Sequence, residues 1–320
     1  MTMIKIIITF LCLFLVMSLA GAEGLAELES RAAAGVADAQ LELGLKYLGG
    51  NELKQDDKQA AAWIGKAAEQ GLAQAQYAIG TMHMAGAGVA YDMKQAIDWF
   101  RLASEQGVAD AQYSLGLIYF EGDALRKDYK RASKLYRLAA EQGNDAAQHA
   151  LGVMYMKGTG VKKNDKEAAR WIQMAAEQGN VEAQNNMGRI FTWGKGVKAD
   201  PAQAATWYRK AAEQGDALAQ YNLGLHYLDG SGVEKSYKEA AHWHTQAAEQ
   251  GIAEAQDYLG IMYANGWGLQ QDLVQAYKYL TISLENGLES AGKHRDAVKK
   301  LMTAEQVQKA EGLARSWFNN

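Results

Sequence analysis

Residues 143–178 read GNDAAQHALGVMYMKGTGVKKNDKEAARWIQMAAEQ. The spacing of this stretch recurs along the chain, because a glycine returns every 36 residues. These glycines are Gly35, Gly71, Gly107, Gly143, Gly179, Gly215, Gly251 and Gly287. A strict period of this length is typical of stacked helix pairs, in which neighbouring pairs bury each other's apolar faces. The sequence therefore predicts an all-α fold, a right-handed α/α superhelical solenoid of about seven repeats with capping helices at its ends.

Each repeat begins with an expected helix, called helix A, when its residues are numbered from the glycine as position 0. Ala recurs at position 4, Leu, Ile or Met at position 8 and usually Tyr at position 12, which lie on one helix face. Glycine recurs at positions 9 and 15. A glycine inside a helix costs about 1 kcal/mol relative to Ala, so position 9 predicts a helix crossing that has no room for a side chain. Glycine at position 15 is expected to end helix A in the left-handed conformation.

A second expected helix, helix B, begins after position 21, where Asp, Asn or Ser can accept a backbone N–H. Gln or Glu at position 24 predicts the return bond of a capping box in every repeat except the third, which has Arg131. Ala at position 25 and a large side chain at position 28 predict that two helices interlock there. The large side chains are Trp63, Trp99, Leu135, Trp171, Trp207, Trp243 and Tyr279. Lys at position 23 in five repeats predicts a solvated convex face.

The pattern A-x-A-Q-x-x-L-G-x-x-Y-x-x-G-x-G-V, followed by A-x-x-W and A-A-E-Q-G, resembles that of the Sel-one-like repeat family, a relative of the tetratricopeptide repeat. Departures are local: His83 replaces Tyr, Leu135 replaces Trp, and Asp123-Ala124 interrupts the G-x-G turn of the third repeat. The resemblance implies an adaptor role, as in bacterial envelope assembly, exopolysaccharide export, periplasmic signalling or contact with host cells.

The same pattern predicts the division of the chain. We expect seven repeats over residues 35–286, preceded by a capping helix over residues 23–34. After Gly287 the pattern lapses, and residues 287–320 are expected to form a capping helix pair, in which Thr303 caps the last helix with Gln306 three residues later. Terminal helices of this kind should present a more polar outer face.

Residues 1–22 are expected to be a cleaved signal peptide. Lys5 supplies a positive charge, an apolar run follows over residues 6–17, and Ala20-Gly21-Ala22 fits the small residues that signal peptidase recognises. The apolar run has about half of the roughly 20 residues needed to span a bilayer. The single cysteine, Cys12, lies inside this run, so we expect no lipid anchor, disulfide or thiolate metal site. The sequence predicts an exported protein, periplasmic or extracellular, with no membrane span after cleavage.

Composition and motifs argue against several function classes. The formal net charge is −4, whereas nucleic-acid binders normally carry a basic stripe. His242 and His244 are two residues apart on a helix and cannot share a metal. Ser290-Ala291-Gly292-Lys293 matches the S-x-x-K of serine β-lactamases, but S-D-N and K-T-G are absent, and we interpret the segment as a loop. We expect a non-enzyme without cofactor or metal.

Residues that break the repeat are the candidates for partner binding, because the repeated ones build the solenoid. Positions 3, 7 and 14 of helix A are expected to line a concave groove, and the early repeats place featureless residues there, such as Ser114 and Ala150. Trp, Tyr and Arg dominate binding hot spots. The candidates are Asn186, Arg189, Trp193, Asn222, Tyr258 and Trp267. Arg189 lies one turn from Trp193, close enough for a cation–π contact.

Three functions agree with these features. The first is an adaptor that holds a protein or peptide in the concave groove, and the second is a binder of cell-wall glycan, for which Trp and Tyr stacking would serve equally well. The third is a hydrolase that recognises β-lactams through Ser290. In an alternative interpretation, Trp193 fills a packing gap and Trp267 folds back onto the solenoid.

Overall fold

The computed structural model describes residues 24–50 and 52–318, which form seventeen α-helices and contain no strand. The predicted signal peptide lies outside the described residues. The chain divides at residue 163 into two bodies. The first holds α2 (Leu25–Ala33), α3 (Ala37–Gly49), α4 (Asp57–Glu69), α5 (Ala73–Ala85), α6 (Met93–Glu105), α7 (Ala109–Glu121), α8 (Tyr129–Glu141) and α9 (Asp145–Lys157). The second holds α10 (Asp165–Glu177), α11 (Val181–Trp193), α12 (Pro201–Glu213), α13 (Ala217–Asp229), α14 (Tyr237–Glu249), α15 (Ala253–Asn265), α16 (Leu273–Glu285), α17 (Ala291–Lys299) and α18 (Ala304–Phe318).

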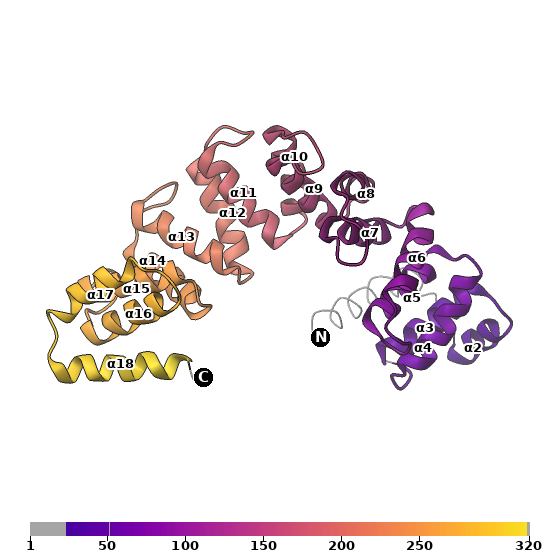
Figure 1. Cartoon of the computed structure of the whole chain (residues 1–320), viewed down its shortest axis with the longest axis horizontal. Helices are drawn as coiled ribbons and strands as arrows, with labels where there is room; N and C mark the ends of the chain where they lie inside the picture. Colours follow the sequence, from indigo (N-terminus) through magenta and orange to yellow (C-terminus); the bar gives the residue numbers. More distant parts are fainter. Residues whose placement is uncertain (1–23, 51, 319–320) are drawn as a thin grey trace. The chain divides into compact units, whose positions relative to one another are not determined.

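Within each body the helices alternate between helix A and helix B and pack as side-by-side pairs (Figure 1). The pairs are α3/α4, α5/α6 and α7/α8 in the first body and α11/α12, α13/α14 and α15/α16 in the second. Successive pairs then pack on one another, as α4 does on α5 and α12 on α13. This arrangement confirms the predicted all-α solenoid.

The glycine at position 9 lies where helix B crosses helix A. A Cβ atom on Gly44 would lie 2.6 Å from Ile64 Cγ1, and one on Gly188 would lie 2.5 Å from the ring of Tyr208. Real Cβ atoms do not approach other atoms so closely, so the predicted close crossing is confirmed. Where the glycine and the helix that crosses it lie in the same body, the side chain over the glycine is the one at position 29, and these side chains are at most 2% exposed. They are Ile64, Phe100, Tyr136, Tyr208, His244 and Leu280.

Position 28, expected to interlock the helices, contacts helix A of its own repeat, as the Tyr279 ring stacks on Tyr263 with centres 5.8 Å apart, and it also packs against clusters that span two repeats. Trp99 contacts the cluster that contains Ile64 and Met82, and Trp243 contacts the cluster around Ala211 and Leu223. Trp171, Trp207 and Tyr279 are buried, whereas Trp63, Trp99, Leu135 and Trp243 are only half-buried. The contact within each helix pair is therefore centred on position 29, one residue later than the sequence pattern indicated.

The helix ends follow the predicted signals with one correction. Glycine at position 15 ends helix A with a left-handed φ, as in Gly194 at 64°. Asp92 Oδ1 accepts the N–H of Gln95 at 3.0 Å, and each helix B has such a cap. The predicted return bond from position 24 is wrong. In six repeats the N–H of the capping residue already donates to the position 12 carbonyl, as Asp200 N–H does to Phe191 O at 2.9 Å.

A chain of side-chain amides joins successive helices B. Gln40 at position 5 donates from Nε2 to Ala32 O at 3.0 Å, and its Oε1 accepts from Gln70 Nε2 at 2.7 Å. The same amide pair recurs in Gln76–Gln106, Gln112–Gln142, Gln184–Gln214, Gln220–Gln250 and Gln256–Asn286. The Gln at position 5 is buried in each of these pairs, so the bonds satisfy polar atoms that water cannot reach.

The C-terminal helices α17 and α18 both pack against α16. Thr303 N–H donates to Gln306 Oε1 at 2.9 Å and Gln306 N–H donates to Thr303 Oγ1 at 3.2 Å, the reciprocal bonds of a capping box. The interpretation of residues 290–293 as a loop is wrong, because Ala291, Gly292 and Lys293 form the first turn of α17. Leu288 and Glu289 carbonyls accept backbone N–H groups of that turn, which explains the early helix start.

The glycine crossing predicts opposite effects for two neighbouring substitutions. Gly44→Ala should lower the free energy of unfolding by about 1 to 3 kcal/mol, because the new methyl group meets Ile64 and the backbone of α4. Gly65→Ala lies within α4, where the added methyl group would have no atom within 4 Å, and should raise the free energy of unfolding by up to about 1 kcal/mol through helix propensity. Denaturant unfolding of both variants measures the difference. A stabilised Gly44→Ala variant would contradict the crossing.

Candidate functional site

The six candidate residues all lie in the second body. Asn186, Arg189 and Trp193 are on α11, Asn222 is on α13 and Tyr258 is on α15, whereas Trp267 follows the glycine that ends α15. Arg189 and Trp193 are in contact with each other. The candidates lie on three successive helices A and on the connector after the last of them.

Trp193 is the last residue of α11 and is 56% exposed. The guanidinium carbon of Arg189 lies 5.2 Å from the centre of its ring, in the contact that the spacing predicted. A second cation was not predicted: Lys195 Nζ lies 5.7 Å from the same ring. Both cations are close enough to interact with the indole face. Lys195 lies two residues after Trp193, in the connector that follows α11. Helical periodicity does not predict the path of a connector, so the sequence pattern could not place Lys195 beside the indole.

Arg189 also lies near Tyr208 of α12. Burial raises the pKa of the Tyr208 hydroxyl, while a hydrogen bond with Thr192 and the positive charge of Arg189 lower it. Thr192 Oγ1 and Tyr208 Oη are 3.4 Å apart, and Thr192 also donates to Gly188 O at 2.8 Å. The last turn of α11 is therefore held against α12 beneath an exposed indole.

Tyr258 is half-buried and packs against helix B of the preceding repeat. Its ring stacks on the imidazole of His244, with centres 5.2 Å apart and planes 6° apart. Tyr221 lies 5.7 Å from the same imidazole and 6.1 Å from Tyr258. One face of Tyr258 is thus covered by the fold, and only the remainder of the ring can contact a partner.

His244 is fully buried between these rings, and neither ring nitrogen has a hydrogen-bond partner. Burial lowers the pKa of the imidazole to about 4. Neutral His244 therefore occupies position 29 as a packing group, in the place that Leu280 takes in the next repeat. His242, two residues away, is exposed and lies 3.0 Å from Gln246 Nε2.

Trp267 is 40% exposed and stacks on Tyr237, with ring centres 5.4 Å apart and planes 19° apart. Lys235 Nζ lies 4.9 Å from the Tyr237 ring. One face of the Trp267 indole therefore lies against helix B of the preceding repeat, as the alternative interpretation described. Asn222 and Asn186 are both half-buried on their helices.

The early repeats are not featureless on the equivalent face. In the first body a hollow of about 260 Å³ lies between α7 and α9, at positions matching those of Arg189 and Trp193. It is lined by Tyr113, Leu117, Phe120, Glu121, Tyr136, His149, Ala150, Val153, Met154, Lys157 and Thr159. Leu117 at position 10 is 39% exposed. Sequence reasoning missed this hollow because the small side chain of Ala150 was taken as uninformative, whereas it leaves space.

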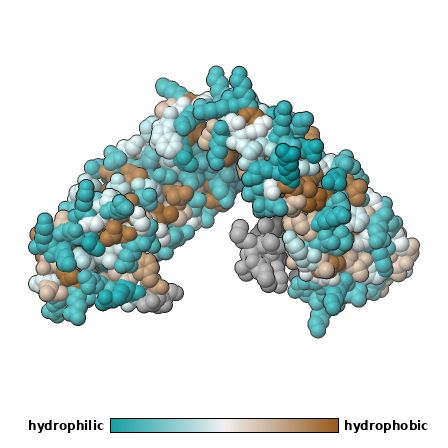
Figure 2. All heavy atoms as spheres, in the orientation of Figure 1, coloured by the Kyte–Doolittle hydropathy of each residue, from teal (hydrophilic) through white to brown (hydrophobic). Residues whose placement is uncertain are grey.

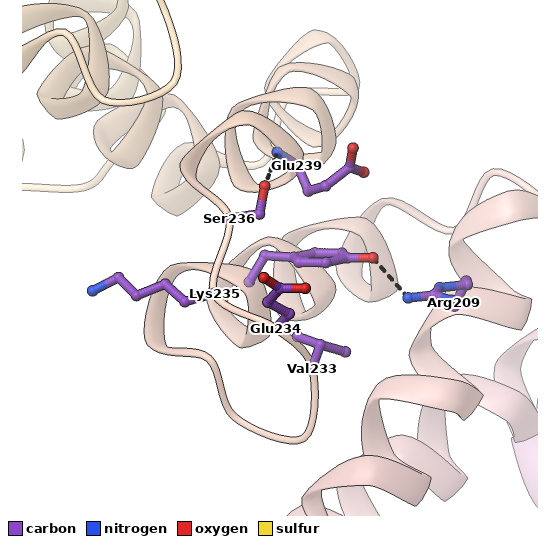
Figure 3. Close-up of a pocket in the computed structure, with 7 residues that line it drawn as sticks. Arg209, Val233, Glu234, Lys235, Ser236 and Glu239 are labelled. Atoms are coloured by element: carbon purple, nitrogen blue, oxygen red, sulfur yellow. Dashed lines mark hydrogen bonds between the residues drawn. The ribbon is translucent and has the colours of Figure 1, made fainter.

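A second hollow, of about 530 Å³, lies between α12 and the connector before α14 (Figure 3). Arg209 donates to the Tyr227 hydroxyl at 2.6 Å, and the Lys235 side chain points away from this bond. Arg137 donates to the Tyr155 hydroxyl at the same two repeat positions in the first body. Because the bond recurs, we interpret it as a link between helix B and the following helix A.

Among the described residues, no group of three or more His, Cys, Asp or Glu side chains is placed so that it could hold a metal ion. Nor does that part of the chain contain a helix long and apolar enough to cross a membrane.

The face drawn in Figure 2 is covered mainly by hydrophilic side chains, with small apolar areas between them. The lysines at position 23 are exposed, which confirms the predicted solvated surface of helix B.

Comparison with known proteins identifies the repeat. The Sel1 repeat model matches residues 37–72, 73–108, 109–144, 145–180, 181–216, 217–252 and 253–288. A Sel1 repeat protein from Oxalobacter formigenes is 34% identical, with 93% of this chain and 86% of that chain covered and a TM-score of 0.66. A protective antigen of uropathogenic Escherichia coli with an SLR fold is 28% identical, with coverages of 93% and 95% and a TM-score of 0.41. No curated protein matched the chain.

The buried imidazole predicts that acid weakens the fold. Between pH 6.5 and about 4, the unfolded chain binds a proton at His244 that the folded chain excludes. The free energy of unfolding should therefore be unaffected by His244 above pH 6.5 and fall by about 3 kcal/mol as the pH reaches 4. Denaturant unfolding across this range measures the loss.

His244→Leu is the control, because repeat 7 carries Leu280 at the same position. This variant should lose much less stability in acid than the wild type. An unchanged acid dependence would mean that other groups cause it.

Proposed function

Because the chain belongs to the Sel1 repeat family, whose members are typically protein-interaction scaffolds, we propose that it is an exported, non-enzymatic adaptor that holds a protein or peptide partner on its helix A face. The helix A face here means the residues at positions 7, 10 and 14 of each repeat. In the second body these include Asn186, Arg189, Trp193, Asn222 and Tyr258.

The observation that carries this proposal is the exposure of Trp193. An indole that is 56% exposed contributes little to the core, and Trp is among the residues enriched at binding hot spots. The last turn of α11 contacts α12 through Thr192 Oγ1 and Tyr208 Oη, which are 3.4 Å apart, so the indole is presented on a packed helix. A partner that covers it would remove apolar surface from water without reorganising the helix.

The charges around Trp193 favour a protein or peptide over the alternative of a glycan. Glycan recognition combines aromatic stacking with neutral hydrogen-bonding groups, whereas the side chains against this indole are Arg189 and Lys195. The stacked pair of Trp267 and Tyr237 is the arrangement that a sugar ring would fit better. Binding to isolated cell wall that disappears in Trp267→Ala would support the glycan alternative.

The proposed export rests on residues 1–22, whose sequence has the features of a signal peptide. If it is correct, the mature protein starts at Glu23 and is recovered outside the cytoplasm. N-terminal sequencing of the protein from fractionated cells tests both points. A protein that retains Met1 and remains in the cytoplasm would contradict the proposal.

Site-specific crosslinking in the native cell tests the binding face. A photoreactive residue at Trp193 or Asn222 should give a crosslinked partner, whereas the same residue at Lys238, exposed on helix B, should give none. With the purified partner, Trp193→Ala should weaken binding by about 2 kcal/mol, or roughly 30-fold, with an unchanged unfolding midpoint. Crosslinks from Lys238 alone would place the partner on helix B and contradict the proposal.

A further inference from the structure

We propose that the cluster of Arg189, Trp193 and Lys195 receives an acidic segment of the partner, in which an Asp or Glu side chain stands beside an apolar one. The inference rests on the proposed function and names the chemistry of the partner. Two cations lie against one exposed indole, at 5.2 Å and 5.7 Å from its centre. Among the described residues, neither cation has a carboxylate oxygen within 4 Å.

Two other cations that lie over aromatic rings differ from this pair because each has a carboxylate partner. Arg170 lies 4.3 Å from the Trp171 ring but also pairs with Glu167 at 3.2 Å. Arg131 likewise lies over the Tyr119 ring and pairs with Asp128 at 3.3 Å. Their charges are compensated within the chain. At Trp193 both positive charges are left for a ligand, although the whole protein carries a net charge of −4.

Lysines that lack a carboxylate occur over other indoles, but those indoles are less accessible. Lys210 lies 4.1 Å from the Trp207 ring, which is 7% exposed, and Lys66 lies 4.1 Å from the half-buried Trp63. A ligand could reach these ammonium groups but could not cover much of the ring. Exposed apolar surface and uncompensated positive charge coincide at Trp193.

The cluster is held in place by the backbone. Arg189 and Trp193 are four residues apart on α11, and Lys195 follows Gly194, which ends that helix in the left-handed conformation. The Lys195 N–H donates to Ile190 O at 3.1 Å, which fixes the start of the connector. The backbone of both charged residues is thus fixed close to the indole before a partner arrives, which lowers the entropy lost on binding.

The chemistry of the ligand follows from these groups. A carboxylate would accept charge-assisted hydrogen bonds from the Arg189 guanidinium and attract the Lys195 ammonium, while an adjacent apolar side chain would cover the indole. An ammonium or guanidinium on the ligand would meet two like charges. The surface therefore discriminates by charge, and its binding should weaken as added salt screens the exposed ions.

Three blocked peptides of equal length test this preference. They share the same leucines and carry Glu, Gln or Lys at every other position. Titration of the full-length protein, followed through the Trp193 indole N–H signal that a Trp193→Phe variant assigns, gives the affinities. The Glu peptide should bind at least about tenfold more tightly than the Gln peptide at low salt, and the Lys peptide should bind most weakly.

Matched variants locate the effect. Arg189→Gln and Lys195→Gln should each weaken binding of the Glu peptide several-fold, whereas Lys238→Gln removes a charge from helix B and should leave it unchanged. Equal affinity for the Glu and Gln peptides, or equal losses in all three variants, would overturn the inference. If crosslinks still form from Trp193 in that case, the helix A face binds a partner of other chemistry, and only the acidic segment is excluded.

Discussion

The crossing of helix A and helix B over a glycine is the constraint on which the repeat depends. With the helices in contact at position 9, the chain must turn back over a short connector, which requires the left-handed glycine at position 15. A further connector glycine then meets the backbone of the preceding helix B. A Cβ atom on Gly196 would lie 2.0 Å from Asp165 O. Close packing within a repeat and between repeats therefore comes from the absence of side chains at a few positions.

The sequence was sufficient to predict the helices and their caps, because those signals are local. It misplaced the centre of the helix contact, since Ile64, Tyr208 and His244 share no chemistry at position 29. What recurs there is a side chain large enough to cover the glycine. The premise that unrepeated residues serve binding therefore fails for the core. The capping-box prediction failed for another reason, because only the folded connector brings the position 12 carbonyl to the capping residue.

For the candidate site, too, the sequence predicted the contact within one helix but not the contacts that depend on the connectors. The contact of Arg189 with Trp193 follows from helical spacing, and the structure contains it. Lys195 could not be assigned to the cluster, because its position depends on how the connector leaves α11. The hollow beside Leu117 and Ala150 was also missed, because the sequence does not show where packed helices leave space between side chains. Binding features that depend on connectors or on small residues thus require the three-dimensional structure.

The amide chain has a consequence for how such a protein can change in length. The Gln at position 5 bonds to the helix B before it and to the helix B after it. Gln220, for example, donates from Nε2 to Ala212 O and accepts at Oε1 from Gln250 Nε2. Six repeats thus present an amide acceptor and an amide donor at their borders. Removing or duplicating a whole repeat in the gene would rejoin matching borders and leave no buried amide unsatisfied. The number of repeats is therefore open to variation by recombination at these borders.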